Sequence, residues 1–259
     1  LSLHDALPIW FQAREFARAE KIYRELLSTP AGTPEDRQGL ADCLAAQGRY
    51  QQALALYRQL LQQDSQSLVL QRKMIMTRYR LGDKAQALAQ LETLYSESPL
   101  NHALFLDELG EPDRAIQLLE TLLKVEPDTT TRWADAANQL AILRIRNGEL
   151  AAAEALLRRA LQRVPKPQEL GSRANLTHNL AETFLQRYQP EQAIPLLEQS
   201  IAAWRQLKKV DSLILSLNNL AAAQQDLGRW DQALGTLREA EEAARGQQVT
   251  TAQGTVANS

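Results

Sequence analysis

The sequence predicts an all-α protein, an α/α superhelical solenoid of about six to seven stacked helix-turn-helix repeats. Hydrophobic residues make up 44% of the 259-residue chain and aromatic residues only 5%. Together with the prevalence of Ala, Leu, Gln, Glu and Arg, this composition is typical of helical chains. Turn residues recur at intervals of roughly 34 to 40 residues, and the helices around them repeat one pattern of small and large residues.

Each repeat is marked by one residue in the turn between its two helices. Glycine suits this position because the residue after a helix end often adopts a positive φ, which a side chain with a Cβ disfavours. Successive markers are 34, 34, 28, 38, 40 and 40 residues apart. The markers are Arg14, Gly48, Gly82, Gly110, Gly148, Tyr188 and Gly228.

The helix after each turn carries a small residue and then a large one, one helical turn apart. We expect the small residue to face the preceding helix, since only a methyl group lets the two backbones approach closely. The small residues are Ala53, Ala87, Ala115, Ala153, Ala193 and Ala233. The large residues are Tyr57, Leu91, Leu119, Leu157, Leu197 and Leu237.

These features divide the chain into four predicted segments. Residues 1–9 do not fit the repeat, lack an initiator Met, and resemble the adapter-derived peptide that contaminates some fragmentary bacterial gene models. Residues 10–127 form an array of short repeats, in which the repeat with its turn at Gly110 is about six residues short. Residues 128–245 form an array of longer repeats, and residues 246–259, rich in Gln, Thr, Gly and Ala, are predicted to be a disordered tail.

The turn glycines and the alternation of small and large residues, in one register across six or seven units, resemble the tetratricopeptide repeat family. The longer repeats carry Asn-Leu-Ala or Gln-Leu-Ala before the turn, at residues 139–141, 179–181 and 219–221. This feature is similar to the extended variant of 40 to 42 residues found in kinesin light chains and many bacterial regulatory proteins. The resemblance implies an array that binds proteins.

Composition argues against several other functions. Lys and Arg number 29 against 31 for Asp and Glu, so a net charge of -2 favours no nucleic-acid partner. Cys43 is the only cysteine and is expected to be buried, while three scattered histidines predict no metal site. No glycine-rich phosphate loop, cofactor motif or catalytic grouping is found, and no apolar run is long enough to span a membrane.

The candidate binding residues are polar side chains on the first helices of the longer repeats. Amides both donate and accept hydrogen bonds, so a row of them on the concave face could bind the backbone of an extended peptide. The alternative is that the same amides bridge adjacent repeats. The predicted peptide-binding residues are Asn138, Gln139, Asn175, His178, Asn179, Glu182, Asn218 and Asn219.

Three further groups of residues carry weaker signals. A clamp for a terminal carboxylate is not supported, because the matching positions hold Gln38 and Asp42. A basic cluster on one helix could attract an acidic segment, although a solvated charged face explains it more simply. This cluster comprises Arg72, Lys73, Arg78 and Arg80. The large aromatic residues Trp133, Trp204 and Trp230 are expected to pack between helices.

The sequence thus favours a non-catalytic scaffold that binds a peptide or a partner helix in its groove. The alternative is a regulatory or sensor segment of a larger signalling protein, transcription regulator or enzyme. The partner is unnamed by the sequence, and homo-oligomers stay open because exposed end helices would carry apolar faces. The compartment is undetermined: the cytoplasm is favoured, but a signal or anchor preceding Trp10 would change this expectation.

Overall fold

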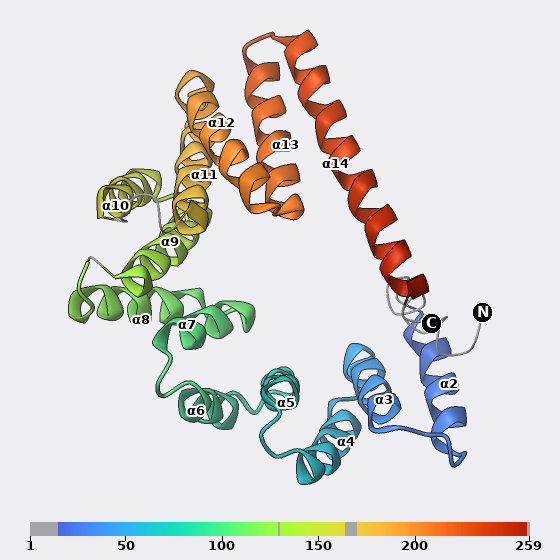
Figure 1. The fold of residues 1–259 in the computed structure, drawn as a ribbon. Helices are drawn as coiled ribbons and strands as arrows, with labels where there is room; N and C mark the ends of the chain where they lie inside the picture. The colour runs from blue at the N-terminus through green and yellow to red at the C-terminus, as the bar shows by residue number, and fades with distance from the viewer. Residues whose placement is uncertain (1–14, 129, 164–169, 258–259) are drawn as a thin grey trace. The chain divides into compact units, whose positions relative to one another are not determined.

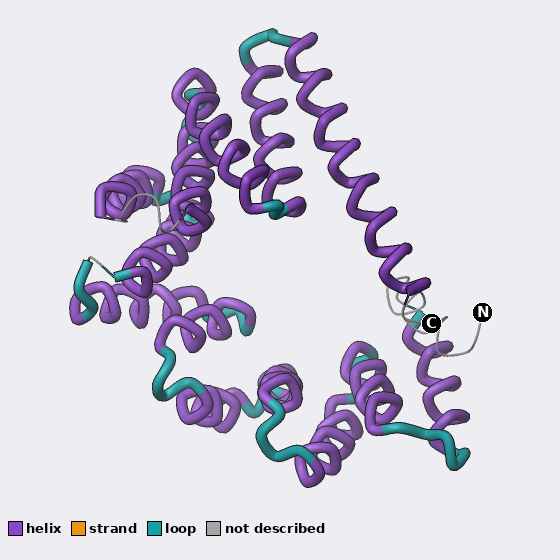
Figure 2. Tube along the Cα trace, viewed as in Figure 1, coloured by secondary structure: helices purple, strands orange, loops and turns teal. Residues whose placement is uncertain are grey.

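The computed structural model describes residues 15–128, 130–163 and 170–257, with side chains described as far as residue 247. All regular elements in these residues are helices, joined by short loops and turns (Figure 2). The chain divides into two compact bodies, Leu1–Ser98 and Pro99–Ser259. The predicted all-α class is therefore confirmed for the described residues.

The first body contains five described helices, drawn in blue to green in Figure 1. They are α2 (Phe16–Leu27), α3 (Pro34–Ala46), α4 (Tyr50–Gln63), α5 (Leu68–Leu81) and α6 (Lys84–Leu94). Consecutive helices contact one another, so each packs mainly on its neighbours in sequence. The predicted non-repeat segment 1–9 and the first marker, Arg14, lie outside the described residues.

The second body contains the helices that follow, drawn in green to red in Figure 1. They are α7 (Pro99–Glu108), α8 (Pro112–Val125), α9 (Thr131–Arg146), α10 (Leu150–Arg163), α11 (Leu170–Gln186), α12 (Pro190–Leu207), α13 (Val210–Asp226) and α14 (Trp230–Ala257). The first helix of the short repeat, α7, has 10 residues where α5 has 14, as the short spacing before Gly110 predicts.

Local chemistry determines where several helices begin. The Thr33 side chain accepts a hydrogen bond from the Asp36 backbone, and the Asp36 side chain accepts one from the Thr33 backbone. The hydroxyl of Thr130 likewise accepts from the backbone N–H of Trp133 at 3.1 Å, at the start of α9. Such caps satisfy N–H groups that have no partner within the helix.

Six turns share one backbone geometry. The five glycine markers from Gly48 to Gly228 have φ between +71° and +104°. The N–H of the residue after each marker donates to a carbonyl five residues earlier, over 2.8 to 3.2 Å. Tyr188 makes the same turn between α11 and α12 with φ at +55°. These turns confirm the predicted repeat register from Gly48 onward.

The small residues that follow each turn are buried. Relative exposure is 0% for Ala53, Ala87, Ala115, Ala153 and Ala193, and 1% for Ala233. The large residues one helical turn later are also buried in five repeats. The exception is Leu237 of the last repeat, which is 39% exposed. Close packing of each helix pair across an alanine is therefore confirmed.

Two features depart from expectation. The helix α14 has 28 residues, continues through 246–257, and runs well past the end of α13 (Figure 1), where the sequence predicted a disordered tail. Extending a formed helix fixes only one residue per added hydrogen bond, so Gly246 and Gly254 need not end it. Trp133 and Trp204 are buried as predicted, whereas Trp230 is 65% exposed and the packing prediction for it is wrong. No following helix covers its side of α14 within the described residues.

Candidate peptide-binding surface

The three longer repeats place their first helices, α9, α11 and α13, side by side. The helix α11 contacts both α9 and α13, while no comparable contact joins the second helices α10 and α12. Neighbouring repeats in this body are therefore closest along their first helices. The side on which elements are closest is the inner side of a curved array, and α9, α11 and α13 form that side.

Polar side chains at matching positions of these helices bond from one repeat to the next. The Nδ2 of Asn179 donates to Oδ1 of Asn138 over 2.7 Å. One repeat later, Nδ2 of Asn219 lies 3.4 Å from Nε2 of His178. Both contacts link residues 41 positions apart, so the same bond is made twice in register. We call this set the polar ladder: Asn138, His178, Asn179 and Asn219.

The histidine extends the polar ladder into the core between α11, α12 and α13. Its Nδ1 lies 2.9 Å from the Ser216 hydroxyl, and the Ser216 and Ser200 hydroxyls are 3.4 Å apart. Ser200 also donates to the Leu197 carbonyl over 2.9 Å. If Asn219 donates to Nε2, the ring proton is on Nδ1 and is donated to Ser216. Burial lowers the pKa of His178, which keeps the ring neutral.

Burial separates the predicted site residues into two groups. Asn138, His178 and Asn179 are buried. Asn175 and Asn218 are exposed, and Gln139, Glu182 and Asn219 are half-buried. The structure therefore brings the buried group together as contacts between repeats, whereas an incoming molecule could reach the second group directly.

The accessible residues follow one face of each first helix. On α11, residues 175, 179, 182 and 186 are spaced by 4, 3 and 4 positions, which places them on one stripe of a helix. The matching stripe on α9 includes Gln139, and on α13 it includes Asn219 and Asp226. We call the partly or fully exposed members the amide stripe: Gln139, Asn175, Glu182, Gln186, Asn219 and Asp226.

Glu182 is one of two acidic members of the amide stripe, the other being the exposed Asp226. Burial raises the pKa of its carboxyl, and a hydrogen bond from Gln186 Nε2 at 3.5 Å opposes that shift. A half-buried carboxylate among amides would accept a hydrogen bond from a backbone N–H or a cationic side chain of a partner. The stripe thus offers hydrogen-bond donors and acceptors for an uncharged backbone, together with two carboxylates.

The first body contains a second polar grouping, around Asp42. Its carboxylate accepts from the Tyr57 hydroxyl at 2.6 Å and from Lys73 Nζ at 2.5 Å. Lys73 of the predicted basic cluster is therefore paired within the fold, and Arg78 lies 4.0 Å from Asp83. Two members of the basic cluster, Lys73 and Arg78, are thus engaged with acidic residues of the same body.

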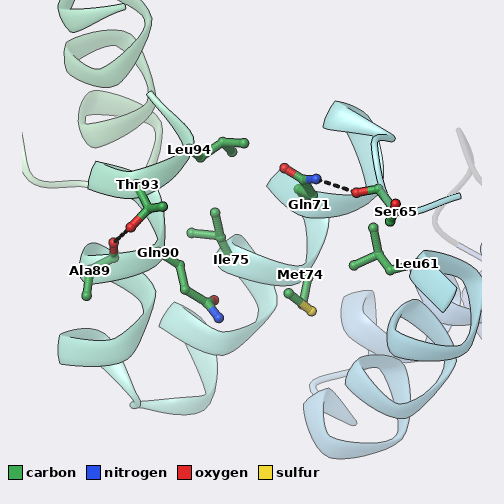
Figure 3. Close-up of a pocket in the computed structure, with 9 residues that line it drawn as sticks. All are labelled: Leu61, Ser65, Gln71, Met74, Ile75, Ala89, Gln90, Thr93 and Leu94. Atoms are coloured by element: carbon green, nitrogen blue, oxygen red, sulfur yellow. Dashed lines mark hydrogen bonds between the residues drawn. The ribbon is translucent and has the colours of Figure 1, made fainter. Parts of the chain in front are cut away.

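Some functional candidates escape sequence reasoning. Ser200 and Ser216 extend the hydrogen bonds of the polar ladder, but isolated serines in helices form no sequence pattern that would predict such contacts. An apolar cavity lies between α4, α5 and α6 (Figure 3), and its only sequence signal is Gln90, a polar residue in a column of mostly leucines.

Neither a metal-binding cluster nor a membrane-spanning helix is found among the described residues. They hold no group of three or more His, Cys, Asp or Glu side chains arranged for a metal ion. Among the helices so described, none combines the length and apolar character of a membrane span. Cys43 is buried as predicted, and burial raises the pKa of its thiol to about 12, which disfavours the reactive thiolate.

Sequence profiles identify the repeat. Three profiles described as tetratricopeptide repeat match the chain, one at residues 9–67, one at 44–105 and 108–176, and one at 172–246. The second of these profiles alone matches more than half of the chain.

The chain belongs to the tetratricopeptide repeat family.

Several solved structures are similar to this chain. MamA of RS-1, crystallised as a double mutant, is 16% identical with a TM-score of 0.50, over 69% of this chain and 94% of that one. A chain of the APC/C hetero-tetramer Cut9–Hcn1 is 14% identical with a TM-score of 0.50, over 89% of this chain and 43% of that one. BtubC (BKLC) from P. vanneervenii is 16% identical with a TM-score of 0.45, over 96% and 93%. Among curated proteins, no sequence matches this chain.

Proposed function

We propose that this tetratricopeptide repeat chain is a protein-interaction scaffold, and that the first helices of its longer repeats bind a partner's peptide or helix. The amide stripe is the observation that supports the proposal. It presents accessible amides on three consecutive first helices, on the inner side of the second body: Gln139 and Asn219 at matching positions of α9 and α13, and Asn175 and Gln186 on α11. The binding itself requires no chemical reaction.

The surface suits a main-chain ligand. An amide side chain can pair with both a backbone N–H and a backbone carbonyl, so it recognises an extended segment irrespective of that segment's side chains. Gln139, Asn175 and Asn219 would supply such pairs. The polar ladder behind them would hold the first helices at a fixed spacing, which lowers the ordering cost of binding.

The proposal is tested by capturing a partner on the full chain, identifying it by mass spectrometry, and then measuring its affinity for variants. Replacing Asn175 and Asn219 by Ala is expected to weaken binding about tenfold or more, while far-ultraviolet circular dichroism stays unchanged. The matched control replaces Gln162 and Gln199 by Ala, since these are exposed amides on the second helices α10 and α12. Equal losses in both double variants, or none in either, would count against the amide stripe.

A further inference from the structure

The arginines of the first helices of the longer repeats are all engaged within the fold. The helices α9 and α11 carry four arginines and no lysine, and α13 carries neither residue. Each arginine lies within salt-bridge or hydrogen-bond distance of an acceptor: Arg132 of Glu126, Arg144 of Glu120, Arg146 of Asp107 and Arg173 of the Leu161 carbonyl. None of these cations is paired with a carboxylate of the amide stripe.

The two carboxylates of the amide stripe are left without a cation in the described part of the chain. Glu182 is half-buried, and its one hydrogen bond there comes from Gln186 Nε2 at 3.5 Å. Asp226 is exposed, and its side chain forms neither an ion pair nor a hydrogen bond with the same residues. Burial of Glu182 without a counter-charge raises the pKa of its carboxyl. The inner side of the second body thus has negative charge that an incoming cation would neutralise.

The polar ladder determines how the Asn219 amide is oriented. The Ser200 hydroxyl has one proton, which it donates to the Leu197 carbonyl over 2.9 Å. Ser216, 3.4 Å from Ser200, must then supply the proton between the two hydroxyls and accept from His178 Nδ1 at 2.9 Å. Nε2 of the neutral ring is consequently an acceptor, and Asn219 meets it with Nδ2. In the opposite direction no proton would lie between the two serines.

The oxygen of each bonded amide in the stripe is therefore left for a ligand. Oδ1 of Asn219 and Oε1 of Gln186 accept no hydrogen bond from the described residues, because each amide is bonded through its nitrogen. Glu182 is four positions after His178, which Asn219 contacts, and four before Gln186, so the three side chains lie within about two turns of α11. We call this set the acceptor cluster: Glu182, Gln186 and Asn219.

We propose that the acceptor cluster binds an arginine side chain of the partner, so that the amide stripe selects a peptide segment with an arginine facing α11 and α13. This inference rests on the proposed function of the stripe. A guanidinium has five N–H donors in a planar fork, which can pair with a carboxylate and still reach neighbouring amide oxygens. It is more weakly hydrated than the ammonium of lysine, which favours arginine at a half-buried carboxylate.

The test passes pools of acetylated and amidated nonapeptides over the immobilised full chain. The central residue is fixed as arginine, citrulline or leucine, and the other positions are randomised. Citrulline has nearly the shape of arginine without its charge, so the arginine pool is expected to be retained about tenfold more than the citrulline pool. In Glu182→Gln this ratio is expected to fall to about one. In the control Glu198→Gln, an exposed carboxylate on the second helix α12, the ratio is expected to persist.

The outcomes separate this inference from the proposed function. Equal retention of the arginine and citrulline pools, or an arginine preference that persists in Glu182→Gln, would overturn the arginine proposal. If pools retained equally are lost in the Asn175 and Asn219 double variant, the stripe binds peptides but does not select arginine. Retention of no pool would count against both proposals.

The orientation of Asn219 has a readout that needs no partner. Nitrogen-15 NMR of the full chain distinguishes the two tautomers of a neutral histidine ring, and the spectrum of His178→Asn identifies the His178 signals among those of three histidines. The expected tautomer has its proton on Nδ1 and none on Nε2. A proton on Nε2 would turn the oxygen of Asn219 toward His178, and would overturn the acceptor cluster as described.

Discussion

Tyr188 occupies a backbone position that five other turns give to glycine. Its φ of +55° places it in the left-handed region, which costs a residue with a Cβ roughly 1 to 2 kcal/mol. Its side chain is 89% exposed, so replacing it removes little packing. The marker pattern nevertheless found this turn, because the surrounding alanine and leucine columns remain in register.

Replacing Tyr188 by glycine is therefore expected to stabilise the chain. The relieved strain exceeds the greater flexibility of glycine in the unfolded chain, for a net gain of about 0.5 to 1 kcal/mol in the free energy of unfolding. Urea denaturation measures the gain. The reverse change, Gly148→Ala, is expected to lose about 1 kcal/mol, since nothing else near the Cβ position would clash. A Tyr188→Gly variant less stable than wild type would show that the tyrosine side chain contributes to stability.

Asn179 tests whether the polar ladder is structural. In Asn179→Ala, the buried Oδ1 of Asn138 loses its donor, which is expected to lower the free energy of unfolding by about 1 to 3 kcal/mol. The exposed Asn175→Ala on the same helix is expected to change it by less than about 0.5 kcal/mol. A double-mutant cycle with Asn138→Ala measures the coupling, and additive losses would mean that the two amides contribute separately.

His178 makes stability depend on pH. Burial lowers its pKa in the folded chain below the ordinary value of 6.5, so the unfolded chain binds a proton more readily. The folded chain is then expected to lose stability as pH falls from about 7 to about 5. His178→Asn installs the residue found at the matching positions 138 and 218, and should flatten this part of the profile. Parallel profiles for the two proteins over that range would exclude His178 as the cause.

At the scale of the helix, the packing of each helix pair depends on one alanine at which the two backbones approach closely. Ala153 joins α9 and α10 with no exposed surface, and a larger side chain there would push the two backbones apart. Ala153→Phe is expected to lower the free energy of unfolding by about 1 to 3 kcal/mol in urea denaturation. Ala155→Phe, at an exposed position of the same helix, is the control. Equal stability of the two variants would mean that the repeat register is misassigned.

Helix ends followed from local rules more readily than helix lengths did. The glycine turns predict boundaries because they satisfy terminal backbone groups within a few residues. The extension of α14 to Ala257 had no such signal, because the residues after Gly246 have neither a cap nor an apolar stripe. Composition alone therefore did not predict where α14 ends.

At the scale of the whole chain, charge is nearly balanced at a net -2. A partner bound by amide contacts is therefore expected to lose less than about threefold in affinity when salt rises from about 50 to about 500 mM. Titration of the captured partner at several salt concentrations measures this. A steep loss would instead indicate an acidic partner on the basic cluster of α5, where Arg80 is exposed.

The sequence by itself determined the family, the helix pairs and the faces that pack within each pair, because these depend on residues a few positions apart. It also located the polar columns on the first helices. Only the tertiary structure decided that Asn179 bonds to Asn138, that Asn175 stays accessible, and that Oε1 of Gln90 is buried without a donor. Those contacts join residues in different helices, and their geometry depends on how neighbouring helices stack, which no local spacing in the sequence encodes.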